Sequence, residues 1–159
     1  MLYRTLFLIF LTIICTTIPV TAAELDNYYL QTSFHTFHYS QKDYQNNQQQ
    51  LLGIERHYSN NKLNGISFFK NTYNQNTIYI YGGKNYSLTK FGKTEITAKL
   101  TYGIVHGYDD EDGKYDTWMH DMETFPAFVF AVGLRRKPYR LDVIPFADAG
   151  IIITGGVEF

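Results

Sequence analysis

The fold is decided by the stretch TEITAKLTYGIVH, residues 94–106. Apolar side chains from Ile96 to Ile104 stand at every second position, and Thr97, Lys99 and Thr101 fall between them. Successive side chains of a β-strand point to opposite faces, so this alternation predicts a strand with one apolar and one polar face. An apolar outer face and a polar inner face are typical of a barrel strand that crosses a lipid bilayer.

Seven further segments have the length and composition of strands, because they are rich in aromatic and β-branched residues. They cover residues 30–40, 50–58, 65–71, 78–86, 127–135, 139–144 and 151–159. The connections 59–64, 87–93 and 136–138 are short, and the longest, 107–124, falls at the opposite end of the predicted barrel. Short turns at one end and longer loops at the other are typical of outer-membrane barrels. We therefore predict an all-β fold, an eight-stranded antiparallel transmembrane β-barrel formed by residues 24–159.

Residues 1–23 have the organisation of a secretory signal peptide. Arg4 precedes an apolar run from Leu6 to Cys15, and Val20 and Ala22 are the small residues before the expected cleavage site. An N-terminal membrane anchor is the alternative, although the run is shorter than the roughly 20 residues that a membrane helix needs. Cys15 is the only cysteine and would leave with the signal, so we expect neither a disulfide nor a thiolate metal site.

Aromatic content separates the remaining classes of protein. The chain has 14 Tyr and 12 Phe, and aromatic residues make up 17% of it. A secreted, aromatic-rich chain without a long apolar helix fits an outer-membrane barrel, whose aromatic side chains gather at both lipid–water interfaces. A secreted lipocalin-like barrel or sandwich is the soluble alternative, because its strands have similar spacing. The net charge of −1 gives no electrostatic support to a nucleic-acid partner.

The chain ends on Phe159, and Val157, Ile153 and Ile151 share its face of the last predicted strand. This arrangement resembles the C-terminal signature that the outer-membrane assembly machinery recognises. We therefore expect that machinery as a partner, together with the phospholipid and lipopolysaccharide around a monomeric barrel in the cell outer membrane.

Four motifs lie in the middle of the chain: SFH at 33–35, LGIER at 52–56, FKNTYN at 69–74 and GG at 82–83. In order and spacing they resemble the Trp-His, Gly-Leu-Ser-Arg, Lys-Asp-Ser-Trp-Asn and Gly-x-Gly motifs of the lipid A palmitoyltransferase (PagP) family. That family forms an eight-stranded outer-membrane barrel and moves an acyl chain from a phospholipid to lipid A. The resemblance implies the same fold and an acyl transfer that needs no cofactor.

Carried over residue by residue, the resemblance assigns His35 as the catalytic histidine and Asn71 and Thr72 as the catalytic aspartate and serine. Gly83 matches the glycine at the floor of the cavity that measures acyl length. The periodicity is compatible, because His35 and Asn71 both fall on the polar faces of their predicted strands, so we expect them inside the barrel and near each other. Asn71 cannot act as a base as a carboxylate would. A polar cluster that merely fills the barrel is the structural alternative to an active site.

Lys70 falls on the opposite face from Asn71, where it either binds a lipid A phosphate or simply extends to the lipid headgroups. His38 falls on the lipid-facing side, and the five histidines show no metal-ligand spacing, so we predict no metal site. The acidic segment 109–123 lacks the helix-loop-helix calcium pattern. We interpret it as a solvated external loop, with Mg²⁺ or Ca²⁺ bridging to lipopolysaccharide phosphates as the alternative.

Three functions remain open at this point. The first is a lipid-handling barrel that binds acyl chains or transfers them to lipid A, and the second is a non-catalytic structural or interaction barrel with exposed loops. The third is a small-solute transporter of the sn-glycerol-3-phosphate type, a label that some short proteins of this general look carry. The barrel interior discriminates among them: an apolar cavity below Gly83 favours lipid, a filled polar core favours structure, and a continuous polar lumen favours transport.

Overall fold

The computed structural model describes residues 23–40, 45–110, 121–146 and 150–159. The strands of these residues are β1 Leu25–His38, β2 Leu52–Tyr58, β3 Lys62–Lys70, β4 Asn76–Phe91, β5 Thr94–His106, β6 Thr124–Arg136, β7 Tyr139–Phe146 and β8 Gly150–Glu158. The predicted signal peptide before Ala23, most of the acidic loop and His120 lie outside the described residues. In the part of the chain that is described, no helix is long and apolar enough to span a membrane.

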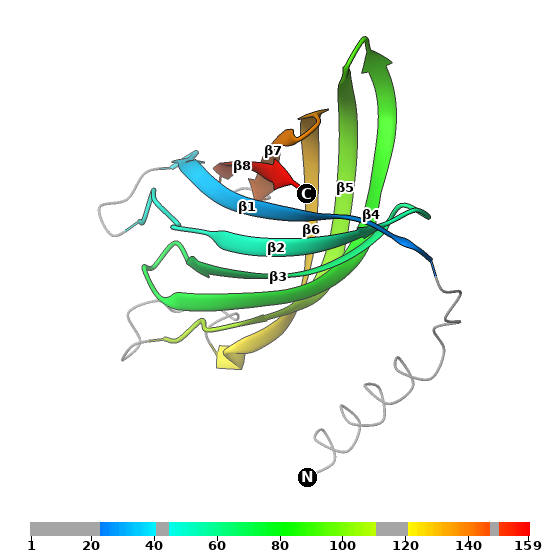
Figure 1. Ribbon diagram of the computed structural model, residues 1–159. Coiled ribbons are helices and arrows are strands. Elements are labelled where there is room, and N and C mark those ends of the chain that lie inside the picture. Colours follow the sequence, from blue (N-terminus) through cyan, green and yellow to red (C-terminus); the bar gives the residue numbers. More distant parts are fainter. Residues whose placement is uncertain (1–22, 41–44, 111–120, 147–149) are drawn as a thin grey trace.

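The eight strands form one closed antiparallel barrel, in which each strand pairs with its neighbours along the chain and β1 pairs with β8 (Figure 1). The predicted all-β, eight-stranded antiparallel barrel is therefore confirmed. Strand β4 is longer than the predicted segment 78–86. Strand β4 continues to Phe91, although its pairing with β3 ends where Lys84 faces Lys62. The β4–β5 hairpin therefore projects beyond the neighbouring strand β3 (Figure 1).

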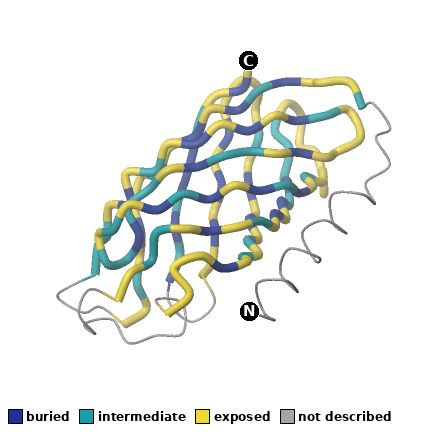
Figure 2. Tube along the Cα trace, turned by 90° about the horizontal axis from the view of Figure 1, so that it is seen from below, coloured by how far each residue is buried: buried dark blue, intermediate teal, exposed yellow. Residues whose placement is uncertain are grey.

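Side chains alternate between the outside and the inside of the barrel wall, with apolar groups outside and mostly polar groups inside. Along most of the strand length, residues with lower and higher exposure alternate (Figure 2). Among the described residues, 16 of the buried side chains are polar or charged and 9 are hydrophobic, whereas 26 large hydrophobic side chains are exposed. In β5, Thr97 and Lys99 are 1% and 5% exposed, and Leu100 and Tyr102 are 48% and 58% exposed. The predicted two-faced pattern of residues 94–106 is thus confirmed.

A β-bulge in β1 changes which side chains point inward. The pairing of β1 with β8 shifts between Ser33 and His35. Because a bulge inserts one extra residue into a strand, the positions beyond it exchange faces. Phe34 fits at the bulge because its ring lies against Gly155, where even a Cβ would come within 2.6 Å of the ring. Beyond the bulge Thr36 is the buried residue, at 3% exposed.

Candidate functional site

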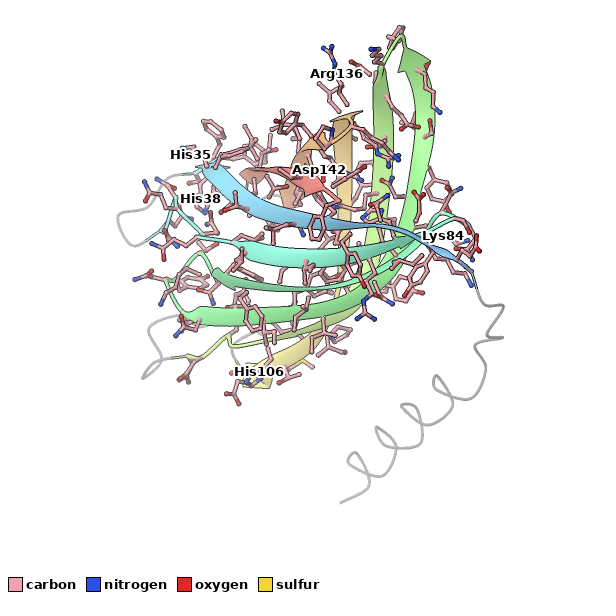
Figure 3. All side chains as sticks on the ribbon, viewed as in Figure 1. His35, His38, Lys84, His106, Arg136 and Asp142 are labelled. Carbon is pink, nitrogen blue, oxygen red and sulfur yellow. The ribbon has the colours of Figure 1, made fainter. Side chains whose placement is uncertain are left out.

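An ion-pair cluster lies inside the barrel and joins inward side chains of β2, β5 and β7, among them Asp142, which Figure 3 labels. Lys99 Nζ lies 2.8 Å from Glu55 Oε1 and 3.2 Å from Asp142 Oδ2. Arg140 Nε donates to both carboxylate oxygens of Asp142, at 2.9 and 3.0 Å. The side chains of all four residues are almost completely buried. Two cations balance two carboxylates, and buried charges of this kind persist only because they are paired.

Further polar side chains complete the coordination of Glu55. Tyr81 donates its hydroxyl to Glu55 Oε1 at 3.0 Å, and Gln31 Nε2 donates to the same oxygen at 3.3 Å. His57 Nε2 lies 2.7 Å from the other oxygen, Oε2. Lys99 Nζ lies 5.5 Å from the centroid of the Tyr29 ring, within the range of a cation–π contact. The cluster is therefore a connected network from β1 to β7 rather than one isolated ion pair.

Further side chains fill the interior on both sides of this cluster. At the end of the barrel with the short β2–β3, β4–β5 and β6–β7 turns, here called the turn end, Arg135 donates to both carboxylate oxygens of Glu158 at 2.7 and 2.8 Å. The opposite end is called the loop end. Towards the loop end, a hydrophobic cluster packs inside the barrel and consists of Leu63, Tyr79, Tyr81, Val105 and Phe125, with Phe69, Tyr108, Ala127 and Val129 against it. Burial raises the pKa of the Tyr108 hydroxyl to about 12, so this side chain stays neutral at the loop end. The arrangement is a filled core with charges at its centre.

His35, the predicted catalytic histidine, lies outside the barrel. It is exposed and its ring packs edge-on against Phe37, with 4.5 Å between the centroids (Figure 3 labels His35). The expectation that His35 points inward is wrong, because the bulge after Ser33 reverses the faces. His38 changes sides with it, and its Nδ1 lies 2.8 Å from Asn47 Oδ1 instead of facing lipid.

Asn71 is buried at 1% exposed, as predicted, but its side chain organises a turn. Its Oδ1 accepts hydrogen bonds from the backbone N–H groups of Tyr73 and Gln75 at 2.9 and 3.1 Å, and its Nδ2 donates to Gln75 Oε1 at 2.9 Å. Asn residues commonly stabilise turns by such local bonds. Thr72 lies in this turn, and its carbonyl accepts the N–H of Asn46 at 2.8 Å. The structure therefore brings Asn71 and Thr72 together and leaves His35 on the other side of the wall.

Gly83 faces Leu63 on one side and Thr101 on the other. A Cβ at this position would overlap the carbonyl oxygen of Leu100, so the glycine permits the close approach of β4 and β5. Two hollows found among the described residues open at the surface, and neither is lined by Gly83. The predicted role of Gly83 as the floor of an acyl cavity stays a prediction.

Lys70 lines one of these hollows, a groove of about 430 Å³ on the outer wall at the loop end. Leu52, Phe68 and Ile78 form its apolar floor, since they face one another across β2, β3 and β4. His106 continues the same row on β5 and lies at the rim. The predicted outward direction of Lys70 agrees with this position.

Sequence reasoning placed Lys99 on the polar face but missed the ion-pair cluster. The available signal was a single charged residue between two apolar neighbours, as in Ala98-Lys99-Leu100 and Leu141-Asp142-Val143. This signal identifies charged residues that point inward. It does not predict which of them form ion pairs, because Glu55 and Lys99 are 44 residues apart in the chain. Pairing requires the register of several intervening strands.

No protein-family model matches this chain, and no curated protein matches it either. The class that the geometry defines is a small eight-stranded antiparallel β-barrel with an apolar wall and a filled, charged interior. Membership of the PagP family stays a prediction.

Proposed function

We propose that this protein is an integral outer-membrane β-barrel that carries out no chemistry and presents its loops for interaction at the cell surface. The inverted polarity of the wall carries the proposal. Phe128 is 79% exposed while Glu55 is 1% exposed, and 26 large hydrophobic side chains are exposed in the described residues. A soluble protein scatters its exposed hydrophobic side chains and rarely buries charges, whereas a membrane barrel directs apolar side chains to lipid.

The height of the apolar wall suits a bilayer. From Ile96 to Ile104, the outward apolar positions of β5 span roughly 27 Å of strand at about 3.4 Å per residue. A strand tilt of roughly 40° converts this length to about 21 Å across the membrane, close to the ~25 Å band of outer-membrane barrels.

The interior favours a structural role over catalysis or transport. The Lys99 ion pairs close the middle of the barrel, and an eight-stranded barrel is only wide enough for its own side chains or one small ligand. The residues that the acyltransferase resemblance would need lie on opposite sides of the wall, because His35 is exposed and Asn71 is buried. Loops are then the part of the molecule left to bind partners.

Insertion is tested with a tryptophan in the wall. Trp118, the only tryptophan, is first replaced by Phe, and Leu100→Trp then reports on lipid contact. We expect strong quenching of this tryptophan by brominated phospholipids in vesicles, and none by an aqueous quencher. The reverse result would refute membrane placement and would favour the soluble barrel.

The absence of chemistry is tested in outer membranes that contain the expressed protein, and the absence of transport is tested in reconstituted vesicles. We expect no change in the mass of lipid A from outer membranes that contain the protein, and no uptake of sn-glycerol 3-phosphate by vesicles that contain it. A mass gain of one acyl chain would overturn the non-catalytic proposal, and solute uptake would establish a transporter.

A second function, acyl-chain binding, is favoured by the groove at Lys70. Its apolar floor and its cationic rim match a lipid with an acyl chain and a phosphate. We expect native mass spectrometry to detect bound lipid that Lys70→Gln releases and that Lys62→Gln, at the other end of the barrel, retains. Equal lipid retention by both variants would rule this site out.

A further inference from the structure

A second hollow lies at the opposite end of the barrel, where the tip of the β4–β5 hairpin meets the β6–β7 turn. It encloses about 490 Å³ and is lined by Lys90, Gly92, Lys93, Thr94, Glu95, Arg135, Arg136 and Lys137. Figure 3 labels Arg136 beside the projecting hairpin. The two connections that form the hollow are 45 residues apart in the sequence, counted from Gly92 to Lys137, and only barrel closure brings them together.

The hollow carries an uncompensated positive charge. Its lining includes five cationic side chains and one carboxylate. Arg135 is paired with Glu158 and Glu95, and Lys90 approaches Glu95 at 3.7 Å. Lys93, Arg136 and Lys137 are exposed and form no ion pair with any described residue. We name these three residues the basic rim.

This charge is a local feature rather than a property of the whole protein. The net charge of the chain is −1, so the basic rim is balanced elsewhere. Asp109, Asp110, Asp121 and Glu123 lie at the other end of the barrel. A surface region with an excess of one charge raises the local concentration of counter-ions, so the basic rim attracts anions.

Exposed apolar side chains flank the basic rim. Leu88 and Phe91 on the hairpin are 59% and 64% exposed, and Tyr139 on β7 is 67% exposed. Tyr139 pairs directly with Arg136 across the β6–β7 turn. Cationic groups beside exposed aromatic and aliphatic groups are the composition of a surface that sits at the lipid–water interface.

We propose that the basic rim binds the phosphodiester headgroup of an anionic phospholipid in the leaflet at the turn end of the barrel. Leu88, Phe91 and Tyr139 contact the adjoining acyl region. The flanking apolar groups favour a lipid over a soluble anion, since they stay exposed to water when only a soluble anion is bound. The inference rests on the proposed membrane placement and adds a specific lipid class to it.

The test uses Phe91→Trp as a reporter on the Trp118→Phe background. Its quenching by brominated phosphatidylglycerol in phosphatidylcholine vesicles is compared with its quenching by brominated phosphatidylcholine in phosphatidylglycerol vesicles. We expect a relative association constant at least about threefold in favour of phosphatidylglycerol at low salt, and a value near one in about 0.5 M NaCl. No preference at low salt would overturn the proposal.

Matched variants locate the effect. Lys93→Gln combined with Arg136→Gln removes two cations of the basic rim, and Lys62→Gln combined with Lys84→Gln removes two exposed cations at the same end but outside the hollow. The first pair is expected to abolish at least half of the preference, and the second to preserve it. Equal losses would show a diffuse surface effect and no site.

Two further measurements distinguish a failure of the headgroup inference from a failure of the proposed membrane placement. Soluble glycerol phosphate is expected not to displace the lipid, and competition by it would replace the lipid proposal with a free-anion site. The Leu100→Trp reporter responds to any brominated lipid, whatever its headgroup. If Leu100→Trp is quenched and Phe91→Trp shows no preference, only the headgroup inference fails. If neither reporter is quenched, membrane placement itself fails.

Discussion

Replacing Lys99 by methionine is the sharpest test of the buried ion-pair cluster. Methionine keeps much of the length of the lysine side chain and removes its charge. The substitution deletes both ion pairs of Lys99 Nζ, at 2.8 Å to Glu55 and 3.2 Å to Asp142. Arg140 is then the only lysine or arginine left in the cluster beside its two buried carboxylates.

The expected loss follows from which partners remain. Removal of one member of a buried ion pair typically destabilises a protein by about 3–5 kcal/mol, because the other charge stays buried without compensation. Here Asp142 keeps Arg140, and Glu55 keeps Tyr81 and Gln31 as donors. We therefore expect the lower end of that range, about 3 kcal/mol of unfolding free energy.

The assay is urea unfolding of the reconstituted barrel, followed by circular dichroism and by the gel mobility of the folded form. Lys84→Met serves as the control, because Lys84 is exposed, and it is expected to change stability by less than about 0.5 kcal/mol. Adding Glu55→Gln to Lys99→Met restores neutrality, so the double variant is expected to lose at least about 1.5 kcal/mol less than the sum of the two single variants. Additive losses, or a neutral Lys99→Met, would refute the coupled cluster.

Three further predictions concern the wall, the turn and the assigned histidine. Leu100→Arg places a charge at the centre of the apolar wall. It is expected to destabilise the inserted barrel by about 2–4 kcal/mol, measured by urea unfolding in vesicles. The same change in a soluble barrel would be nearly neutral. Asn71→Ala removes the side chain that accepts the N–H groups of Tyr73 and Gln75. It is expected to lower the free energy of unfolding by about 1–2 kcal/mol in the same assay. A neutral result would show that the turn does not depend on these bonds. His35→Ala removes an exposed ring and is expected to leave stability within about 0.5 kcal/mol; lipid A mass spectra that differ between His35→Ala and the unmodified protein would restore a catalytic role.

The fold was predictable because the clearest strands record the two sides of the wall in their own sequence. In residues 94–106 the alternation from Ile96 to Ile104 identifies the strand and assigns its faces without knowledge of any neighbour. The end of β4 was not predictable in this way. Beyond Lys84 the strand leaves β3, and Tyr86, Leu88 and Phe91 are exposed on a projecting hairpin that does not enclose the barrel interior, so burial no longer alternates along it.

The ion-pair cluster depends on information that no single strand contains. Lys99 is an inward charge in any register of β5 that keeps Leu100 outside. The register of β2 and β7 relative to β5 determines that its partners are Glu55 and Asp142. A shift of one residue in any of those strands would turn the partner outward, so the pairing follows from the whole barrel and not from a motif.

The position of His35 shows why a match of motif spacing does not transfer an active site between barrels. Motif spacing counts residues along a strand, and in an unbroken strand that count also determines the face on which each side chain lies. The bulge at Phe34 breaks this relation. The number of residues between the motifs does not reveal a bulge, but the residue that β1 accommodates there reverses the face on which His35 lies. Phe34 can occupy the bulge because Gly155 on β8 has no side chain, so the cause lies 121 residues away, counted from Phe34 to Gly155. A substitution such as Gly155→Leu would compete with Phe34 for this space, and its effect on the exposure of His35 would test whether the glycine holds the histidine outside.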